Sequence, residues 1–258
     1  MGFPREPDRM RTRFLLAIVL SLSAPPLIGA GAQTQPANTV RTLLASGRLA
    51  SVVDMPLYFR LFRVRLPASE QATYTGPNAV LYGLSGTLTT NTSGTTQTVA
   101  EGAGTFIPAS MSTTVRASTD PASFLLFVLS PAAESDKPPL GPPATVEDLY
   151  RTPGPVPDLK SGPYEFSLTR VELPARMPPN PTHYRSGAAL YYILAGTGAF
   201  TAEGKTEPRT AGMPHFERSA LVHQWANPGE TRLVLIQANI SQDGMPAVLP
   251  GTPPTGQR

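Results

Sequence analysis

Short apolar runs recur along the chain, and each is rich in β-branched and aromatic residues. Glycine, proline, asparagine and aspartate bound the runs, which is the pattern expected of β-strands. Neither half of the chain carries a long apolar pattern with the helical period of 3.6 residues. Many short strands at regular spacing predict an all-β fold, either a sandwich, a jelly roll or a small barrel. The clearest runs cover residues 58–66, 79–84, 123–129, 188–194 and 231–239.

Two stretches of sequence each resemble a second stretch about 110 residues further along the chain. The first is FRLFRVRLP at 59–67, which shares six of its nine residues with FSLTRVELP at 166–174. The second is AVLYGLSGT at 79–87, which shares five residues with ALYYILAGT at 189–197. Matches in the same order at a nearly constant offset indicate a duplicated domain of ordinary size.

The duplication sets the predicted domain bounds. An N-terminal barrel covers residues 33–130, and a C-terminal barrel covers 164–240. The nine prolines of 131–163 predict a stiff linker between them. Within this linker, 144–152 predicts one short helix, because a threonine precedes two acidic residues. The last stretch, 241–258, predicts a disordered tail.

The start of the chain has the layout of a secretory signal peptide. Arg11 and Arg13 form a basic end, residues 14–22 form an apolar run, and 30–32 supply small residues for cleavage. We therefore predict that 1–32 is removed and that the protein is exported, to the periplasm or outside the cell. An uncleaved membrane anchor is the alternative, although the run is short for a spanning helix and prolines follow it.

Composition narrows the function classes. The chain has 30 Pro and 22 Gly among 258 residues, which argues against a coiled coil or a helical bundle. It has no Cys, which excludes thiolate zinc sites, iron–sulfur clusters and thiol nucleophiles. The formal charge of +3 falls to +1 without residues 1–32, which hold four Arg against two acidic residues. Nucleic acid and anionic membranes are therefore poor candidate partners.

The segment PTHYRSGAALYYILAGTG, residues 181–198, contains four positions whose spacing is informative. They are His183, Arg185, Ala189 and Gly196. Their spacing resembles the first motif of the cupin family, which reads His-x-His, three residues, Glu, six residues, Gly. Arg185 stands at the second His of the motif, and Ala189 stands at its Glu. Side chains alternate along a strand, so His183 and Arg185 are expected on one inner face.

A second spacing resembles the second cupin motif, which reads Gly, five residues, Pro-x-Gly, two residues, His, three residues, Asn. Gly212, His223 and Asn227 hold their places, while Arg218 and Ala220 replace the Pro and Gly. Both motifs are in order on a β-rich background. The resemblance implies two tandem cupin-type jelly-roll β-barrels, a bicupin, with a C-terminal domain similar to the type-2 cupins and with degenerate metal-binding motifs.

The resemblance also implies a metal site in the C-terminal barrel. Of the four ligands in the family pattern, His183 and His223 remain, and His215 is a third candidate with Glu217 on its face. These histidines are the predicted ligands of one divalent ion, Mn, Fe, Zn or Ni. Arg185 opposes this prediction, because a permanent cation beside a divalent ion is unfavourable. Absence of any cofactor is the alternative.

In the N-terminal barrel, the corresponding positions fall on Thr73, Thr75, Ala79 and Thr113. None of these residue types replaces an imidazole or a carboxylate as a strong ligand. The N-terminal barrel is therefore predicted to lack a metal.

Arg185, Tyr191 and Trp225 are the predicted substrate-binding residues. The Arg185 guanidinium suits a carboxylate or another anion, and Tyr191 and Trp225 are expected to face the barrel interior. The same residues have a structural interpretation, as a salt bridge at the barrel mouth and as ordinary aromatic core. His183 and His223 are then remnant polar residues, hydrogen-bonded inside the barrel.

Three functions follow from these residues. The first is an exported cupin-domain protein that binds a small molecule, which Arg185 indicates to be anionic. The second is a metal-dependent enzyme of the dioxygenase or decarboxylase type. The third is a non-catalytic structural protein, in which the barrels form a homodimer or larger oligomer. The sequence names no catalytic residue and leaves open whether the protein is an enzyme.

Overall fold

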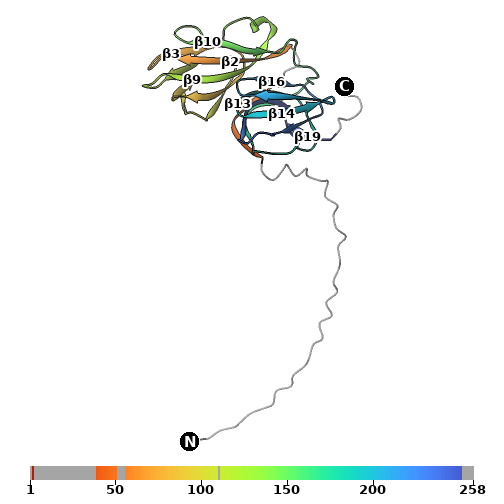
Figure 1. Cartoon of the computed structure of the whole chain (residues 1–258). Coiled ribbons are helices and arrows are strands. Elements are labelled where there is room, and N and C mark those ends of the chain that lie inside the picture. Colours follow the sequence, from red (N-terminus) through yellow and green to blue (C-terminus); the bar gives the residue numbers. More distant parts are fainter. Residues whose placement is uncertain (1, 3–38, 51–55, 110, 252–258) are drawn as a thin grey trace, which may run out of the picture. The chain divides into compact units, whose positions relative to one another are not determined.

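The computed structural model describes residues 2, 39–50, 56–109 and 111–251. The predicted signal peptide, 1–32, lies outside these residues except for Gly2. Within the described residues, no helix has the length and apolar character needed to cross a membrane. Two β-barrels, each built from two sheets, account for the described chain, so the predicted all-β, two-barrel fold is confirmed (Figure 1).

The first barrel consists of a five-stranded sheet and a four-stranded sheet. The five-stranded sheet has the order β10 (Thr145–Arg151), β2 (Leu57–Leu66), β9 (Ala122–Pro131), β4 (Ala79–Ser85) and β7 (Gly104–Ile107). The four-stranded sheet has the order β3 (Gln71–Tyr74), β8 (Thr113–Ala117), β5 (Leu88–Thr92) and β6 (Thr95–Val99). A single 3-10 turn, Ala132–Glu134, follows β9.

The second barrel consists of two five-stranded sheets. One has the order β1 (Val40–Leu49), β11 (Tyr164–Leu173), β18 (Leu233–Gln242), β13 (Ala188–Ala195) and β16 (Pro214–Glu217). The other has the order β15 (Lys205–Thr210), β14 (Thr197–Ala202), β17 (His223–Ala226), β12 (His183–Arg185) and β19 (Val248–Pro250). Its strands run from green to blue in Figure 1, with the orange strand β1 beside them.

The segment 144–152 is not a helix, so that prediction is wrong. It forms β10, which pairs antiparallel with β2. The two acidic residues that suggested a helix start form ion pairs with arginines of β2 instead: Glu147 lies 2.8 Å from Arg63, directly opposite, and Asp148 lies 3.0 Å from Arg60, on the diagonal. Opposite charges facing across an antiparallel pair stabilise a strand at this position.

The predicted disordered tail is also corrected over its described part. Strand β18 continues to Gln242, and the chain then returns as β19, which pairs with β12. Gly251 N donates a further hydrogen bond to Thr182 O at 3.0 Å. The edge of β12 supplies backbone hydrogen-bond partners for this segment. The glycine- and proline-rich composition of the segment gives no sign of that pairing. Residues 252–258 lie outside the described part.

The two barrels differ in what fills them. The interior of the first is mainly an apolar cluster, with Phe62, Val64, Tyr74, Leu81 and Phe124 among its buried members, and its strands also bury Arg60, Thr90 and Thr113. The interior of the second has a shorter apolar cluster and buried polar side chains beside it. These are His183, Arg185, His215, Glu217, His223, Gln237 and Asn239. A third cluster contains residues of both barrels, including Phe59, Phe127, Phe166, Leu190 and Ile236.

Asn227, the last residue of the second motif, closes the turn between β17 and β18. Its amide nitrogen donates to the backbone oxygens of Leu173, Pro174 and Thr231 at 2.9–3.1 Å, and its Oδ1 accepts from Gly229 N at 3.0 Å. The side chain is fully buried. These contacts explain why an asparagine stands there.

Asn227→Ala is expected to lower the free energy of unfolding by about 2–3 kcal/mol, because buried carbonyls lose their donor. Asn227→Asp is expected to cost at least as much, since a carboxylate would face the same carbonyls. Urea unfolding at pH 7 measures both variants. A loss below about 0.5 kcal/mol, the range of an ordinary surface change, would contradict the structural role.

Candidate functional site

The polar interior of the second barrel is built by strand register. Ala189 on β13 lies opposite Glu217 on β16 and opposite Asn239 on β18. Tyr191, two residues later, lies opposite His215 and Gln237. Side chains two apart share a face, so these residues form two adjacent rows across the inner face of one sheet.

The facing sheet completes this interior. His183 on β12 pairs in register with His223 on β17, and their ring centroids are 4.3 Å apart. Arg185 and Trp225, two residues beyond each histidine, are buried on the same side. The structure therefore brings together all the predicted site residues. We call His183, Arg185, Tyr191, His215, Glu217, His223 and Trp225 the polar cluster.

Glu217 lies at the centre of the polar cluster and is fully buried. Its Oε2 accepts from Arg185 Nε at 2.8 Å, and its Oε1 accepts from Trp225 Nε1 at 2.8 Å. Burial alone would raise the pKa of Glu217, but His223 and Arg185 outweigh it and hold the pKa well below its usual range. The carboxylate is therefore ionised at neutral pH.

Sequence reasoning placed Glu217 on the face of His215 but gave it no role. Glu217 lies opposite Ala189 in the sheet, and Ala189 occupies the position where the family motif has its Glu. The neighbouring strand β16 delivers a carboxylate directly opposite that position. This pairing is a property of the sheet and is invisible in the spacing of a single motif.

Arg185 is the largest fully buried side chain of the described chain, with 1% exposure. It pairs with Glu217 and donates through Nη2 to the Tyr191 hydroxyl. Burial lowers the pKa of Arg185, but Tyr191 and Glu217 raise it above its ordinary value. Its third nitrogen, Nη1, has no hydrogen-bond partner among the described residues. The salt bridge that the structural interpretation placed at the barrel mouth therefore lies deep in the interior.

His183 and His223 are oriented in the same way. The Nδ1 of His183 lies 2.9 Å from Pro181 O, and that of His223 lies 2.8 Å from Leu221 O. A carbonyl only accepts, so both Nδ1 atoms carry the proton and both Nε2 atoms are free to accept in the neutral ring. Burial and the neighbouring His223 lower the pKa of His183 to about 4. His223 Nε2 lies 3.2 Å from Glu217 Oε1, without the alignment of a hydrogen bond.

His215 is in the opposite tautomer. Its Nδ1 accepts from Arg209 Nε at 3.0 Å, so its proton is on Nε2 in the neutral ring. Burial lowers the pKa of His215 to about 4. Its ring packs edge-on against Phe200 at 4.2 Å between centroids. His215 therefore presents an N–H donor to the interior and not a lone pair.

These residues do not fit the predicted divalent metal ion. Glu217 has both oxygens engaged by Arg185 and Trp225, and His215 turns an N–H inward. Within the described residues, no group of three His, Cys, Asp or Glu side chains has an arrangement that holds a metal. The Arg185 guanidinium adds a fixed positive charge beside these groups. The assignment of His183, His223 and His215 as ligands stays a prediction, and we derive no chemistry through a metal.

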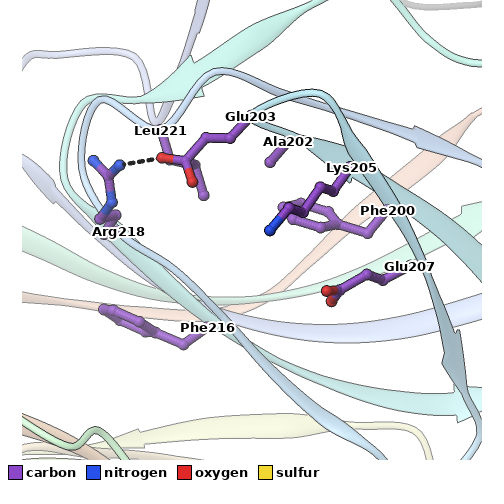
Figure 2. A pocket seen from close by; sticks show the side chains of 8 residues that line it. All are labelled: Phe200, Ala202, Glu203, Lys205, Glu207, Phe216, Arg218 and Leu221. Carbon is purple, nitrogen blue, oxygen red and sulfur yellow. Dashed lines mark hydrogen bonds and ion pairs between the residues drawn. The ribbon is translucent and has the colours of Figure 1, made fainter.

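A pocket of about 370 Å³ opens beside the polar cluster. We call it the edge pocket. In Figure 2, the ion pair of Arg218 with Glu203 lies at one end, and Lys205, Phe200 and Glu207 lie at the other. Phe200 belongs to both regions, since its ring lines the pocket and packs against His215 and His223. The remaining lining residues are Ala202, Phe216 and Leu221.

The correspondence between the barrels needs one correction. Thr73 and Thr75 are exposed, whereas Tyr74 between them is fully buried. Tyr74 pairs with Thr113 as His183 pairs with His223, so the true counterpart of His183 is Tyr74. The motif spacing slips by one residue here, and a slip of one residue exchanges inner and outer faces. Tyr74 donates to Pro77 O at 2.6 Å.

Comparison with known proteins agrees with this architecture and defines the class as the two-barrel cupin fold. No protein-family model matches the chain, and no curated protein matches it. Solved structures do match, and oxalate decarboxylases are among them. A structure described for its substrate binding mode and a reaction specificity switch has 12% identity and a TM-score of 0.55, covering 79% of this chain and 78% of that chain.

The oxalate decarboxylase of Bacillus subtilis gives similar values. Its structure at pH 4.6 has 13% identity and a TM-score of 0.53, with 79% of this chain and 78% of that chain covered. A structure used to study the Mn(II) centres of the same enzyme has 12% identity and a TM-score of 0.53 at the same coverage, 79% and 78%. Likeness at such low identity concerns the fold.

Proposed function

We propose that the C-terminal barrel binds a small anionic molecule without a metal ion. One observation carries the proposal: Arg185 is 1% exposed, and its Nη1 has no partner among the described residues. A buried guanidinium with an unused N–H is costly unless an acceptor meets it. A carboxylate or a similar anion is the acceptor that a guanidinium binds best.

The difference between the barrels supports this proposal. Duplicated domains start with equivalent interiors. Here the strands of the first barrel bury mainly apolar residues with Arg60, Thr90 and Thr113, while the second holds an ion pair and three imidazoles. Polar groups in a core cost stability. Their concentration in one barrel is therefore better explained by binding than by folding. Tyr191 and Trp225 supply the aromatic surface that small-ligand sites usually combine with a few polar groups.

The edge pocket is the ligand's proposed route to this interior, because Phe200 both lines the pocket and contacts His215 and His223. Its volume of about 370 Å³ falls within the usual range of about 300–1,000 Å³ for small-molecule sites. Among the described residues, Lys205 has no ion-pair partner, whereas Glu203 and Glu207 are paired with Arg218 and Arg209. An anion therefore meets an unpaired ammonium at the mouth and, beyond Phe200, the polar cluster.

Calorimetric titration with a panel of small carboxylates tests the proposal on the full mature chain. The protein is first stripped with a chelator and its metal content is checked by elemental analysis. We expect at least one carboxylate to bind without metal, and Arg185→Gln to weaken that binding by about tenfold or more. Arg232→Gln is the matched control, because Arg232 is an exposed arginine paired with Glu172.

Other outcomes decide between the alternatives. Binding that returns only with Mn, Fe, Zn or Ni, and is lost in His183→Ala or His223→Ala, would favour a metal-dependent enzyme. No binding by any carboxylate, together with a stable oligomer, would favour the structural alternative. Export remains part of the proposal, and N-terminal sequencing of the protein recovered outside the cytoplasm would test cleavage after residue 32.

A further inference from the structure

Unpartnered polar atoms gather in the second barrel. Eight buried side-chain nitrogen and oxygen atoms of the described residues have no hydrogen-bond partner, and six of them belong to this barrel. The six are Arg41 Nε, Arg185 Nη1, His215 Nε2, His223 Nε2, and both Oδ1 and Nδ2 of Asn239. Native interiors leave few such groups, so a cluster of them calls for a common cause.

Arg41 reaches this interior from the strand that is farthest away in sequence. It lies on β1 opposite Val171, a residue of the inner apolar cluster. Its Nη1 donates to Gln237 Oε1 at 3.3 Å, across the intervening strand β11. Gln237 in turn lies opposite Tyr191. Arg41 therefore extends over the inner face of the sheet toward the polar cluster.

The charges of this interior do not balance within the described residues. The ion pair of Arg185 with Glu217 is neutral as a unit. Burial and the positive charge of Arg185 lower the pKa of Arg41, while Tyr191 and Glu217 raise it, so its guanidinium senses the charges of the polar cluster. No described carboxylate forms an ion pair with Arg41. Arg41 is only partly buried, and its positive charge has no described anionic partner, so a singly charged anion would neutralise it.

Asn239 adds a second requirement. It is 1% exposed, and it lies in the same row as Ala189 and Glu217. Its Nδ2 donates and its Oδ1 accepts, and both atoms lack partners among the described residues. A hydroxyl or a primary amide satisfies both atoms, because each of these groups donates and accepts.

Building on the proposed function, we infer that Arg41 and Arg185 jointly bind the carboxylate of a singly charged ligand, whose hydroxyl or amide group pairs with Asn239. The ligand class is therefore the small hydroxy- or amido-monocarboxylates. Arg41, on the first described strand, would thus contribute to the selection of a carboxylate by the C-terminal barrel.

Titration of the mature protein at pH 7 with four matched probes tests this inference. Glycolate has the charge and the hydroxyl, acetate lacks the hydroxyl, malonate has a second charge, and glycolamide is neutral. Larger hydroxycarboxylates, up to a hydroxybenzoate, extend the series. We expect the hydroxycarboxylate to bind about tenfold more tightly than its hydroxyl-free analogue, and more tightly than the dianion, with no binding of the neutral amide.

Substitutions of Arg41 and Arg48, both on β1, supply the decisive comparison, and a substitution of Asn239 on β18 tests the hydroxyl contact. Arg41→Gln is expected to weaken hydroxycarboxylate binding by about tenfold or more, and Asn239→Leu to remove the preference over acetate. Arg48→Gln, on the same strand but exposed and paired with Asp243, is expected to bind as the unchanged protein does. Unfolding curves confirm that each variant is folded. Arg41→Met, which also removes the charge, replaces Arg41→Gln if the glutamine variant does not fold.

The two proposals fail in different ways. If no monocarboxylate binds the unchanged protein, the proposed function falls and this inference falls with it. If carboxylates bind but Arg41→Gln or Arg41→Met binds them equally well, or if the dianion binds best, only the assignment of Arg41 and of the ligand charge is overturned.

Discussion

Arg185→Met is expected to lower the free energy of unfolding by about 3–5 kcal/mol, because it leaves the Glu217 carboxylate buried without its cation. Both side chains are at most 1% exposed, so water does not replace the lost partner. For a domain of this size, each kcal/mol corresponds to about 2–4 °C in Tm. The melting temperature should therefore fall by roughly 6–20 °C. Urea and thermal unfolding at pH 7 measure the change.

A second substitution separates the charge effect from simple loss of packing. Adding Glu217→Gln to Arg185→Met removes the uncompensated charge and keeps an acceptor for Trp225, so most of the stability should return. Arg232→Met is the control, since its exposed pair with Glu172 should contribute less than about 1 kcal/mol. A loss below about 1 kcal/mol in Arg185→Met, or a double variant less stable than the single one, would contradict this account.

Acidification from pH 6.5 to 4 should destabilise the protein by several kcal/mol. His183 and His215 have pKa values of about 4 in the folded barrel, against about 6.5 in an unfolded chain. Between these values the unfolded chain binds more protons, so stability falls as the pH falls. Each histidine contributes about 3 kcal/mol over this window, since one pH unit of displacement corresponds to 1.36 kcal/mol. Glu217, with its lowered pKa, adds a further loss only below about pH 4.

Urea unfolding at pH 7, 5.5 and 4.5 measures this dependence. The double variant His183→Gln, His215→Gln should show a flatter profile, because the groups that the unfolded chain protonates are gone. An equally steep profile in the double variant would show that the acid sensitivity arises elsewhere.

The sequence predicted the fold through its duplicated runs and the spacing of two motifs. Those signals are local, and so they placed His183, Arg185, His223 and Trp225 on inner faces. The role of Glu217 depends on pairing between β13 and β16, and the contribution of Arg41 depends on a strand from the far end of the chain. Neither pairing leaves a trace in the spacing of one segment.

The misassigned segments have a similar cause. The acidic residues of 144–152 and the proline-rich tail have the local composition of a helix start and of a loose end. Both become strands because an exposed edge of a sheet offers them backbone partners. Thr73 was placed inward because motif spacing was carried across a duplication in which one residue of register had shifted. Tertiary pairing overrides local preference at each of these places.

Strand β1 makes the order of synthesis matter for this protein. Its partner β11 begins at Tyr164, so β1 leaves the ribosome well before the strand it pairs with. At about 5–20 residues per second, the delay is on the order of ten seconds. During that time an edge strand is without its sheet, and such strands invite pairing with other chains. The C-terminal barrel expressed alone, from residue 164, would lack both this strand and Arg41. The described residues from 39 to 251 belong to one compact unit, and the unit of folding and of engineering is accordingly the pair of barrels.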